Sequence, residues 1–317
     1  MRRVLICGAT GFIGRNLAER FSSDPRYVVT GVHHRRPPFD CPNLSWVQAD
    51  LTSGEDVNRV LDGQDVVLQA AATTSGVRTT VTRPSDQIVA NAVMNSYIFA
   101  AALEKQIRHV VFPSCTIMLE SSERPQTEDD YDPRVDPLPV YEGAAHTKLY
   151  IERMGAFYAK RGGVKFTMLR HSNVYGPYDK YDLQRSHVFG ATITKVLSAT
   201  DGRVHVWGTG EEKRDLLHVD DLVDAFAAAI ERQQEPYGLY NIGCGQAVSV
   251  RDLVAQVITA SGRSLETVYD ESKPTVKTSV SLDCRKAERE LGWRSKIALA
   301  HGIDRTIAWW RENRPAG

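Results

Sequence analysis

Residues 1–15 read MRRVLICGATGFIGR, and this stretch decides the fold. Residues 4–7 form a short apolar run typical of a buried strand, and Gly8, Gly11 and Gly14 follow it at once. The next residues, 16–20, have helical character. A strand that ends in glycines just before a helix presents the free amides of that helix to a phosphate group. The stretch therefore predicts a dinucleotide-binding site at the start of the chain.

Glycine is needed at each position of this turn for a different physical reason. Gly8 permits the tight turn out of the strand, Gly11 lets the backbone approach a pyrophosphate, and Gly14 lets the helix pack closely on the sheet. The spacing is G-x-x-G-x-x-G instead of the more common G-x-G-x-x-G. Three glycines alone can be a simple loop, but their place between a strand and a helix favours the dinucleotide site. The candidate cofactor contacts of the turn are Gly8, Thr10, Gly11, Phe12, Ile13 and Gly14.

The composition is that of an ordinary globular protein. With 317 residues the chain can form one large α/β domain with a smaller appendage, or two domains. A formal net charge of +0 argues against binding nucleic acid by neutralising phosphates. The five cysteines lack C-x-x-C spacing and fit free thiols in a reducing compartment, with no metal site. No apolar run approaches the roughly 20 residues of a membrane span, and the first strand leaves no room for a signal peptide. We therefore expect a cytoplasmic protein with no membrane or nucleic-acid partner.

A basic segment follows the second expected strand, residues 27–32. It consists of His33, His34, Arg35 and Arg36. The residue that ends this strand faces the adenosine ribose, where a carboxylate accepts from a free 2′-hydroxyl and basic groups accommodate a 2′-phosphate. Because the acid is absent, the sequence favours NADP over NAD. The alternative is a solvated basic loop.

Two further strand ends add candidate cofactor contacts. The third strand, 44–49, ends at Asp50 and Leu51. Asp50 can accept from an adenine amino group, or it can cap the helix that begins after Thr52. The fourth strand, 65–72, ends with three alanines, whose small side chains let a ligand lie close, and Ala70 and Ala71 are the candidate cofactor contacts among them.

Strand and helix patterns alternate along the chain. Such alternation predicts an α/β fold with a doubly wound parallel sheet and right-handed crossovers. We expect a cofactor domain over residues 1–177 with return segments at about 219–243, and a smaller α/β substrate domain mainly over 178–317. The elements expected after the fourth strand are helix 88–103, strand 109–112, a surface loop over 120–139, helix 143–161, strand 165–170, helix 219–233, strand 240–243 and a helix through 260 with Ser249 as its N-cap.

The ordered set of motifs resembles the extended short-chain dehydrogenase/reductase family, in its nucleotide-sugar branch of epimerases, dehydratases and reductases. The set comprises the glycine turn, Asp50-Leu51, Ser114, Lys148, NVYGP at 173–177, RDLLHVDD at 214–221 and LGW at 291–293. The resemblance covers nearly the whole chain and implies a Rossmann cofactor domain. Residues 70–72, 186–188, 206–210 and 272–274 are similar to GDP-sugar 4-keto reductases of the GDP-fucose synthase type. That likeness implies NADPH and a nucleotide-diphosphate sugar, with GDP favoured.

The family's Y-x-x-x-K arrangement implies the catalytic residues. The tyrosine exchanges a proton at the sugar oxygen while the nicotinamide carries hydride, and the lysine ammonium lowers the pKa of the tyrosine. Ser114 and Lys148 match the serine and lysine, and Lys148 also matches a cofactor contact. The tyrosine position is Ala144, which has no proton to exchange. This departure puts catalysis by the chain in doubt.

Three explanations of Ala144 are open. We favour an inactive Tyr→Ala variant, of the kind made to hold a substrate without turnover. The second is a natural member that takes its proton elsewhere, for example from Tyr141 one turn earlier. The third is a non-catalytic relative that binds the nucleotide sugar.

A second departure concerns epimerisation. Epimerising relatives carry a cysteine two residues after the serine, paired with a histidine. Here that place is Thr116, whose hydroxyl is too weakly acidic to be a general base, while His187 is retained. We therefore expect simple 4-keto reduction, with His187 binding or polarising the substrate or being only a satisfied polar residue. The alternatives are 3,5-epimerisation with 4-reduction and NAD-dependent 4-epimerisation. Cys115 is expected to be a small buried residue.

The resemblance also implies the substrate contacts and a homodimer. Arg214 matches a nucleotide ribose or phosphate contact, although it can instead pair with Asp215 or Asp220. Relatives often hold the diphosphate with an arginine where this chain has Ser279, so Lys277 is the cation expected there. Relatives dimerise through the helix that carries Lys148 and the one before it. The implied substrate contacts are Thr116, Asn173, His187, Trp207, Arg214 and Lys277.

Overall fold

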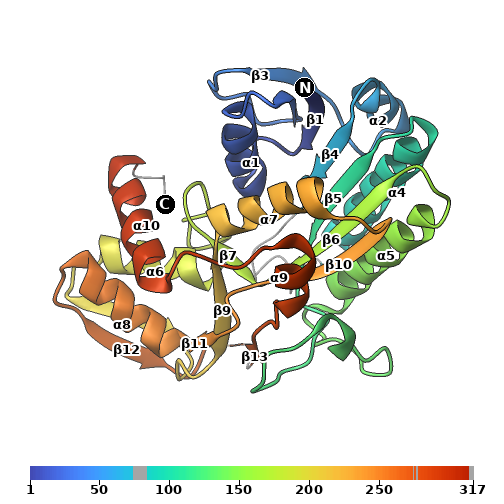
Figure 1. Ribbon diagram of the computed structural model, residues 1–317. Coiled ribbons are helices and arrows are strands. Elements are labelled where there is room, and N and C mark those ends of the chain that lie inside the picture. The colour runs from blue at the N-terminus through green and yellow to red at the C-terminus, as the bar shows by residue number, and fades with distance from the viewer. Residues whose placement is uncertain (74–83, 274, 276–277, 314–317) are drawn as a thin grey trace.

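A seven-stranded parallel sheet runs through the computed structural model in the order β10-β6-β5-β4-β1-β2-β3 (Figure 1). The chain order reverses between β4 and β1. The structure describes residues 1–73, 84–273, 275 and 278–313. The strands are β1 (Arg2–Cys7), β2 (Tyr27–His33), β3 (Leu44–Gln48), β4 (Val66–Gln69), β5 (His109–Ser114), β6 (Lys165–His171) and β10 (Tyr237–Ile242).

Helices cover both faces of this sheet and create two hydrophobic cores. Along β1, Val4 and Ile6 pack into one core and Leu5 and Cys7 into the other, because side chains alternate along a strand. The doubly wound α/β fold predicted from the sequence is confirmed. The first core is covered by α1 (Phe12–Ser22), α7 (Val219–Arg232) and α9 (Arg285–Leu291), and the second by α2 (Gly54–Leu61), α4 (Ile88–Glu104) and α5 (Glu142–Ala159). A 3₁₀ turn, η1 (Pro84–Gln87), precedes α4.

The remaining elements pack around a third core, away from the main sheet in Figure 1. The expected N-cap of α8 is confirmed, since the Ser249 hydroxyl accepts from the Asp252 amide at 3.0 Å. Strand β10 is an edge of the main sheet and α7 covers one of its faces, and the domain division with its return segments stays a prediction. The elements away from the main sheet are β7 (Asn173–Tyr175), α6 (Val188–Ser198), β8 (Arg203–Trp207), β9 (Lys213–His218), β11 (Ala247–Ser249), α8 (Val250–Ser261), β12 (Glu266–Asp270), β13 (Ser279–Val280) and α10 (Leu299–Asn313).

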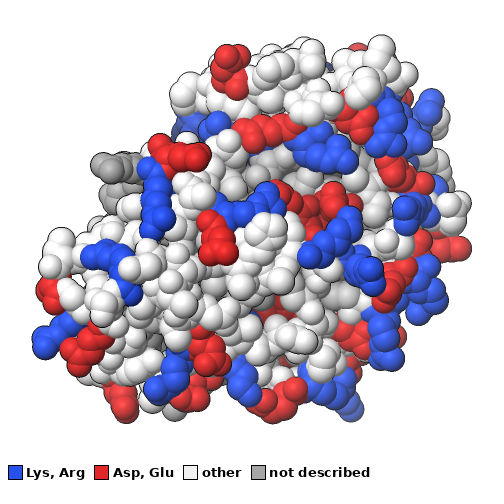
Figure 2. Space-filling model, turned by 60° about the vertical axis from the view of Figure 1, so that its left-hand side comes forward, with Lys and Arg blue, Asp and Glu red and all other residues white. Residues whose placement is uncertain are grey.

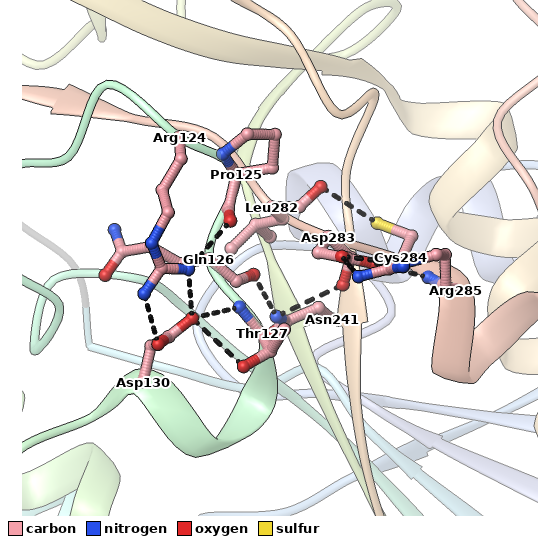
Figure 3. A network of polar contacts seen from close by, with 10 residues as sticks. All are labelled: Arg124, Pro125, Gln126, Thr127, Asp130, Asn241, Leu282, Asp283, Cys284 and Arg285. Carbon is pink, nitrogen blue, oxygen red and sulfur yellow. Dashed lines mark hydrogen bonds and ion pairs between the residues drawn. The ribbon is translucent and has the colours of Figure 1, made fainter.

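Residues 120–139 differ from the expected surface loop. The segment contains a 3₁₀ turn, η2 (Glu128–Asp130), and the buried Gln126. The Gln126 carbonyl accepts from Asn241 Nδ2 at 2.8 Å and from the Asp283 amide at 2.7 Å (Figure 3). Glu128 Oε1 accepts from the Asn241 amide at 2.7 Å. The physical reason is that β10 is an edge strand, and its buried polar groups require partners from this segment.

A buried carboxyl group lies in the turn after β7. Tyr178 has a positive φ of 70°, and Asp179 follows it with 9% exposure. Asp179 Oδ1 accepts from the Lys180 amide at 2.7 Å, whereas Oδ2 has no hydrogen-bond partner among the described residues. Burial raises the pKa of Asp179 to about 7, and the amide and charge of Lys180 offset only part of this. The charged carboxylate is therefore unfavourable in the folded state.

We predict that Asp179→Asn stabilises the protein at pH 8. The pKa of Asp179 rises from 3.8 to about 7 on folding, so the folded state binds more protons in this interval and stability falls as pH rises through it. The side-chain amide of the variant carries no charge, so above pH 7 the unfolding free energy of the variant exceeds that of the unmodified protein by at most about 4 kcal/mol. Melting temperatures of both proteins should converge near pH 4. The exposed Asp304→Asn is the control, and an equal gain for Asp179→Asn at pH 5 and pH 8 would contradict the prediction.

Candidate cofactor and substrate site

The turn after β1 and the turn after β4 touch where the chain order of the sheet reverses. Ligands of open α/β sheets bind at such a switch point. Gly8 has a φ of +71°, and a Cβ there would lie 2.6 Å from Ala71 Cα. A Cβ on Gly14 would lie 2.0 Å from the Gly8 carbonyl oxygen. Glycine is therefore required at both positions, and the cradle fits the close approach of a pyrophosphate. Ala70, the other small residue here, donates its amide to the Cys7 carbonyl at 3.2 Å.

Helix α1 begins directly at this turn. Its N-cap is Gly11, which supplies no capping side chain, and its first turn holds no acidic residue. The first amides of the helix, including those of Phe12 and Ile13, therefore suit the oxygen atoms of an anion.

The segment after β2 contacts the glycine turn. Arg36 Nη1 donates to the Thr10 carbonyl at 3.5 Å, and both Arg35 and Arg36 are exposed. The His33 ring packs edge-on against Trp46 with centroids 6.1 Å apart. This position therefore offers cations and an aromatic ring, and no carboxylate ends β2.

Asp50 does not cap α2. The N-cap is Ser53, whose hydroxyl accepts from the Asp56 amide at 3.4 Å. Asp50 Oδ1 accepts from the amide and hydroxyl of Thr52 at 2.9 and 2.7 Å, and these bonds lower the pKa of Asp50. The capping alternative is wrong, because Ser53 stands closer to the helix. The neighbouring Leu51 is buried in the second core.

A buried ion pair anchors the middle of α5 to β6. Arg170 Nη2 lies 2.7 Å from Glu152 Oε2, with both side chains 4% exposed. The Ser114 hydroxyl, fully buried at the end of β5, donates to Glu152 Oε1 at 2.6 Å. The sequence reasoning missed Glu152, although it follows Lys148 by one helical turn. The structure thus turns the Ser114 hydroxyl toward Glu152.

Lys148 lies one turn before Glu152. Its Nζ donates to the Pro113 carbonyl at 2.9 Å and lies 4.4 Å from the centre of the Phe112 ring. Burial lowers the pKa of Lys148. Ala144 is one turn earlier and half-buried, so the two share one face of α5. The ammonium is in place, and no phenol stands at position 144.

Three basic side chains gather beyond this point, and the sequence reasoning identified only His187 among them. His171 ends β6, and its Nδ1 lies 2.7 Å from the Ser172 carbonyl. Burial, with smaller contributions from the charges of Lys148 and His187, lowers the pKa of His171 to about 4, although the bond to Ser172 opposes the shift. Burial also lowers the pKa of His187, with a contribution from Lys180. The charge of Lys180 thus acts on His187, and the charges of His187 and Lys148 act on His171. The missed signal for His171 was its place at the end of a buried strand.

The expected substrate contact Arg214 lies on β9, outside the seven-stranded sheet. Arg214 Nη1 donates to the Lys213 and Thr278 carbonyls at 2.7 and 2.9 Å. Its expected alternative partners bond elsewhere: Asp220 pairs with Arg305, and Asp215 accepts from the Cys244 amide at 2.8 Å. The ion-pair alternative is therefore not the arrangement found.

The other substrate candidates are placed as follows. Asn173 begins β7 and is half-buried, and Thr116 lies just beyond β5 with partial exposure. Trp207 ends β8 with 50% exposure, and Lys195 Nζ lies 5.7 Å from its ring centre. Lys277 lies outside the described residues. Cys115 was expected to be buried, but it is only half-buried.

The surface carries interspersed charges on the face shown in Figure 2. In the described ranges, none of the helices has the length and apolar character to cross a membrane. Within the same ranges, no three His, Cys, Asp or Glu side chains gather as metal ligands.

Comparisons with known proteins agree with this geometry. Residues 4–243 match the model of the NAD dependent epimerase/dehydratase family. The chain is 30% identical to probable GDP-L-fucose synthase 1 of Oryza sativa subsp. japonica, over 84% of this chain and 82% of that protein. It is 29% identical to a dTDP-glucose 4,6-dehydratase of Streptomyces antibioticus, over 98% of this chain and 93% of that protein.

A solved structure extends the agreement to the fold. The structure of MoeE5 in complex with UDP-glucuronic acid and NAD superposes with a TM-score of 0.83 at 28% identity. The superposition covers 98% of this chain and 99% of MoeE5. The matched range contains the glycine turn, Ser114, Lys148 and Arg214. The chain belongs to the NAD dependent epimerase/dehydratase family, in the extended short-chain dehydrogenase/reductase group that acts on nucleotide sugars.

Proposed function

We propose that this protein is an NADP-dependent reductase of a nucleotide-linked 4-keto-6-deoxy sugar, with GDP as the nucleotide, and that Ala144 makes this chain an inactive Tyr→Ala variant of it. One observation carries the proposal. Lys148 bonds to Pro113 near the carboxyl end of β5, and the glycine cradle lies at the carboxyl end of β1 in the same sheet. A bound nicotinamide cofactor would supply hydride at that edge. The residues that we assign to cofactor binding are Gly8, Thr10, Gly11, Phe12, Ile13, Gly14, His33, Arg35, Arg36, Asp50, Leu51, Ala70, Ala71 and Lys148.

The choice of NADP rests on the end of β2. The exposed guanidinium of Arg36 lies against the glycine turn, where the 2′-phosphate of NADP would add two negative charges. A carboxylate that would select the free hydroxyl of NAD is missing from this position. The alternative is NAD, the cofactor in the MoeE5 structure.

The choice of reduction over epimerisation rests on Thr116 and His187. Proton exchange at the carbons beside a ketone needs a base, and the Thr116 hydroxyl is too weak for this. His187 is the N-cap of α6, and burial lowers its pKa and so favours the neutral ring, which suits hydrogen bonding to the sugar. Epimerisation coupled to reduction is the runner-up because this histidine is present, and a non-catalytic relative is the third possibility because of Ala144.

We assign the nucleotide sugar mainly to residues 178–317 and the cofactor to residues 1–177 with the return segment. Lys148, through its positive charge, would favour ionisation of a phenol one turn earlier, and Ser114 completes the assigned catalytic set with Ala144 and His187. A GDP-sugar is supported by the Oryza sativa relative, while the dTDP- and UDP-sugars named for other relatives are the alternatives. The proposed substrate contacts are Thr116, Asn173, His187, Trp207, Arg214 and Lys277.

The outer faces of α4 and α5 support a homodimer. These two helices pack against each other and leave large apolar side chains at the surface. Their exposed large apolar residues are Val89, Tyr97, Tyr150 and Phe157, with exposures of 66%, 43%, 40% and 45%. Covering this surface with a second copy would remove it from water.

We predict that Ala144→Tyr raises NADPH oxidation with a GDP-4-keto-6-deoxy sugar by about tenfold or more, because a positioned acid is restored beside Lys148. Absorbance at the reduced-nicotinamide band measures the rate. Ala144→Phe is the matched control, since it adds the ring without the hydroxyl. Equal rates for the two variants would contradict the proposed reductase chemistry.

We predict that Arg36→Ala weakens NADPH binding by about tenfold or more and leaves NADH binding within about twofold, because a charge-assisted bond to the 2′-phosphate is lost. Fluorescence titration of the reduced cofactors measures both constants. Arg108→Ala removes an exposed guanidinium beyond the opposite end of the strands and serves as the control. A parallel loss of NADPH and NADH affinity would argue against 2′-phosphate recognition.

We predict that Phe157→Glu converts a dimer into monomers, because the new charge would be buried at the proposed interface. Light scattering after size-exclusion chromatography reports the mass. Leu183→Glu changes an exposed apolar residue outside α4 and α5 and should leave the dimer intact. A monomeric unmodified protein would refute the interface.

A further inference from the structure

The guanidinium of Arg15, one residue beyond the glycine turn, contacts two aromatic rings from distant parts of the chain. Its Cζ atom lies 4.2 Å from the centre of the Phe39 ring and 3.9 Å from the centre of the Tyr178 ring. Both distances are well inside the range of about 6 Å over which a cation and a ring attract each other. The Arg15 Nε donates to Glu19 Oε1 at 3.1 Å, one turn along α1. Arg15 therefore joins two separate segments to the first helix of the cofactor cradle.

Phe39 belongs to segment 34–43, which connects β2 to β3 and carries Arg36. Its ring also packs edge-on against Trp46 of β3, with ring centres 5.1 Å apart. The two residues at 37–38, between Arg36 and Phe39, are both prolines, and each fixes its own φ at about −65°. The chain between Arg36 and Phe39 is therefore stiff. The place of the Phe39 ring helps to set the place of Arg36.

The contacts of the Phe39 ring carry much of the anchoring of this segment. Within the described part of the chain, the backbone of residues 35–40 forms no hydrogen bond to other backbone groups. Arg36 Nη1 reaches the Thr10 carbonyl at 3.5 Å, which is long for an N–H···O bond. Since backbone bonds are missing, the position of residues 35–40 depends on the two neighbours of Phe39, namely Trp46 and Arg15.

The Tyr178 side gives Arg15 a firm support. Asn16 Nδ2 donates to the Pro177 carbonyl at 3.0 Å and so ties the turn after β7 to α1. The Tyr178 ring packs edge-on against Trp309 of α10, with ring centres 5.2 Å apart. The backbone of Tyr178 has a φ of 70°, which is rare for a bulky residue and persists only where the surroundings hold it. Arg15 is therefore held from one side and can hold the segment after β2 on the other.

Arg15 and Arg36 are suited to different tasks. Arg36 is exposed, and within the described ranges it forms no ion pair, so its charge is available to an anionic ligand. Arg15 is half-buried, and the carboxylate of Glu19 at 3.1 Å offsets its attraction for an anion. Arg36 is thus the phosphate ligand of this region, whereas the contacts of Arg15 suit it to hold the segment in place.

We propose that Arg15 is a positioning residue for the 2′-phosphate of NADP, because it holds Phe39 and, through the stiff chain, Arg36 beside the glycine turn. The inference rests on the proposed function, which takes the preference for NADP from Arg36. Without the contact between Arg15 and Phe39, segment 34–43 would sample more positions, and Arg36 would lose more conformational freedom on binding the phosphate. NAD has no 2′-phosphate, so its binding does not depend on this order.

Cofactor titrations of matched variants test the role of Arg15. Arg15→Ala removes the cation, and Phe39→Leu removes the ring without changing any charge. Each should weaken NADPH binding about three- to tenfold and leave NADH binding within about twofold. Because both variants break one contact, the double variant should bind NADPH within about twofold of either single variant. Fluorescence titration of the reduced cofactors measures the constants and needs no turnover, so Ala144 does not affect the test.

Two controls separate this role from a general loss of structure. Phe39→Tyr keeps the ring and should keep the affinity for both cofactors. Arg20→Ala removes an exposed guanidinium from the same helix, 3.7 Å from Asp24, and should leave both constants unchanged. Unchanged NADPH binding in Phe39→Leu would overturn the inference, because Arg15 would then act without Phe39. Equal losses of NADPH and NADH affinity in Arg15→Ala would overturn it as well.

The outcomes also distinguish this inference from the proposed function. A selective loss of NADPH affinity in Arg36→Ala, with no loss in Arg15→Ala and Phe39→Leu, would keep the NADP dependence and overturn the role of Arg15. Equal affinity of the unmodified protein for NADPH and NADH would overturn the NADP dependence, and with it the role of Arg15.

Discussion

The buried ion pair between Glu152 and Arg170 holds the site together. It joins the middle of α5 to β6, and Glu152 also accepts the Ser114 hydroxyl at the end of β5. Removing one partner of such a pair typically costs about 3–5 kcal/mol, because the other charge stays buried. The pair therefore fixes where α5 sits on the sheet, and with it the positions of Lys148, Ala144 and Tyr141.

This constraint explains how a chain without the family's tyrosine keeps an ordered site. Helix α5 is anchored by Glu152 and by the bond from Lys148 to Pro113, neither of which involves position 144. The glycine cradle depends on contacts within the turns after β1 and β4. The glycine cradle and Lys148 are thus held in place by contacts that do not involve the missing phenol.

Much of the architecture could be predicted because it depends on local rules. The strand and helix periods set the parallel sheet, and the close contacts of Gly8 and Gly14 explain why the turn needs glycine. The features that escaped prediction depend on distant partners. Glu152 gains its role from Arg170, 18 residues later, and the loop over 120–139 is ordered by Asn241, 113 residues from Glu128. Asp50 and Ser53 both fit a helix cap, and only the observed hydrogen bonds distinguish them.

The central claim is that the site, with the tyrosine restored at position 144, transfers hydride to the carbonyl carbon of a nucleotide-linked keto sugar. The most direct measurement incubates the Ala144→Tyr variant with a GDP-4-keto-6-deoxy sugar and NADPH deuterated at C4 on the transferred face. Mass spectrometry and NMR then locate deuterium in the product. The account predicts deuterium at C4 of the sugar. A product without deuterium, or no product from a protein that binds both ligands, would contradict it.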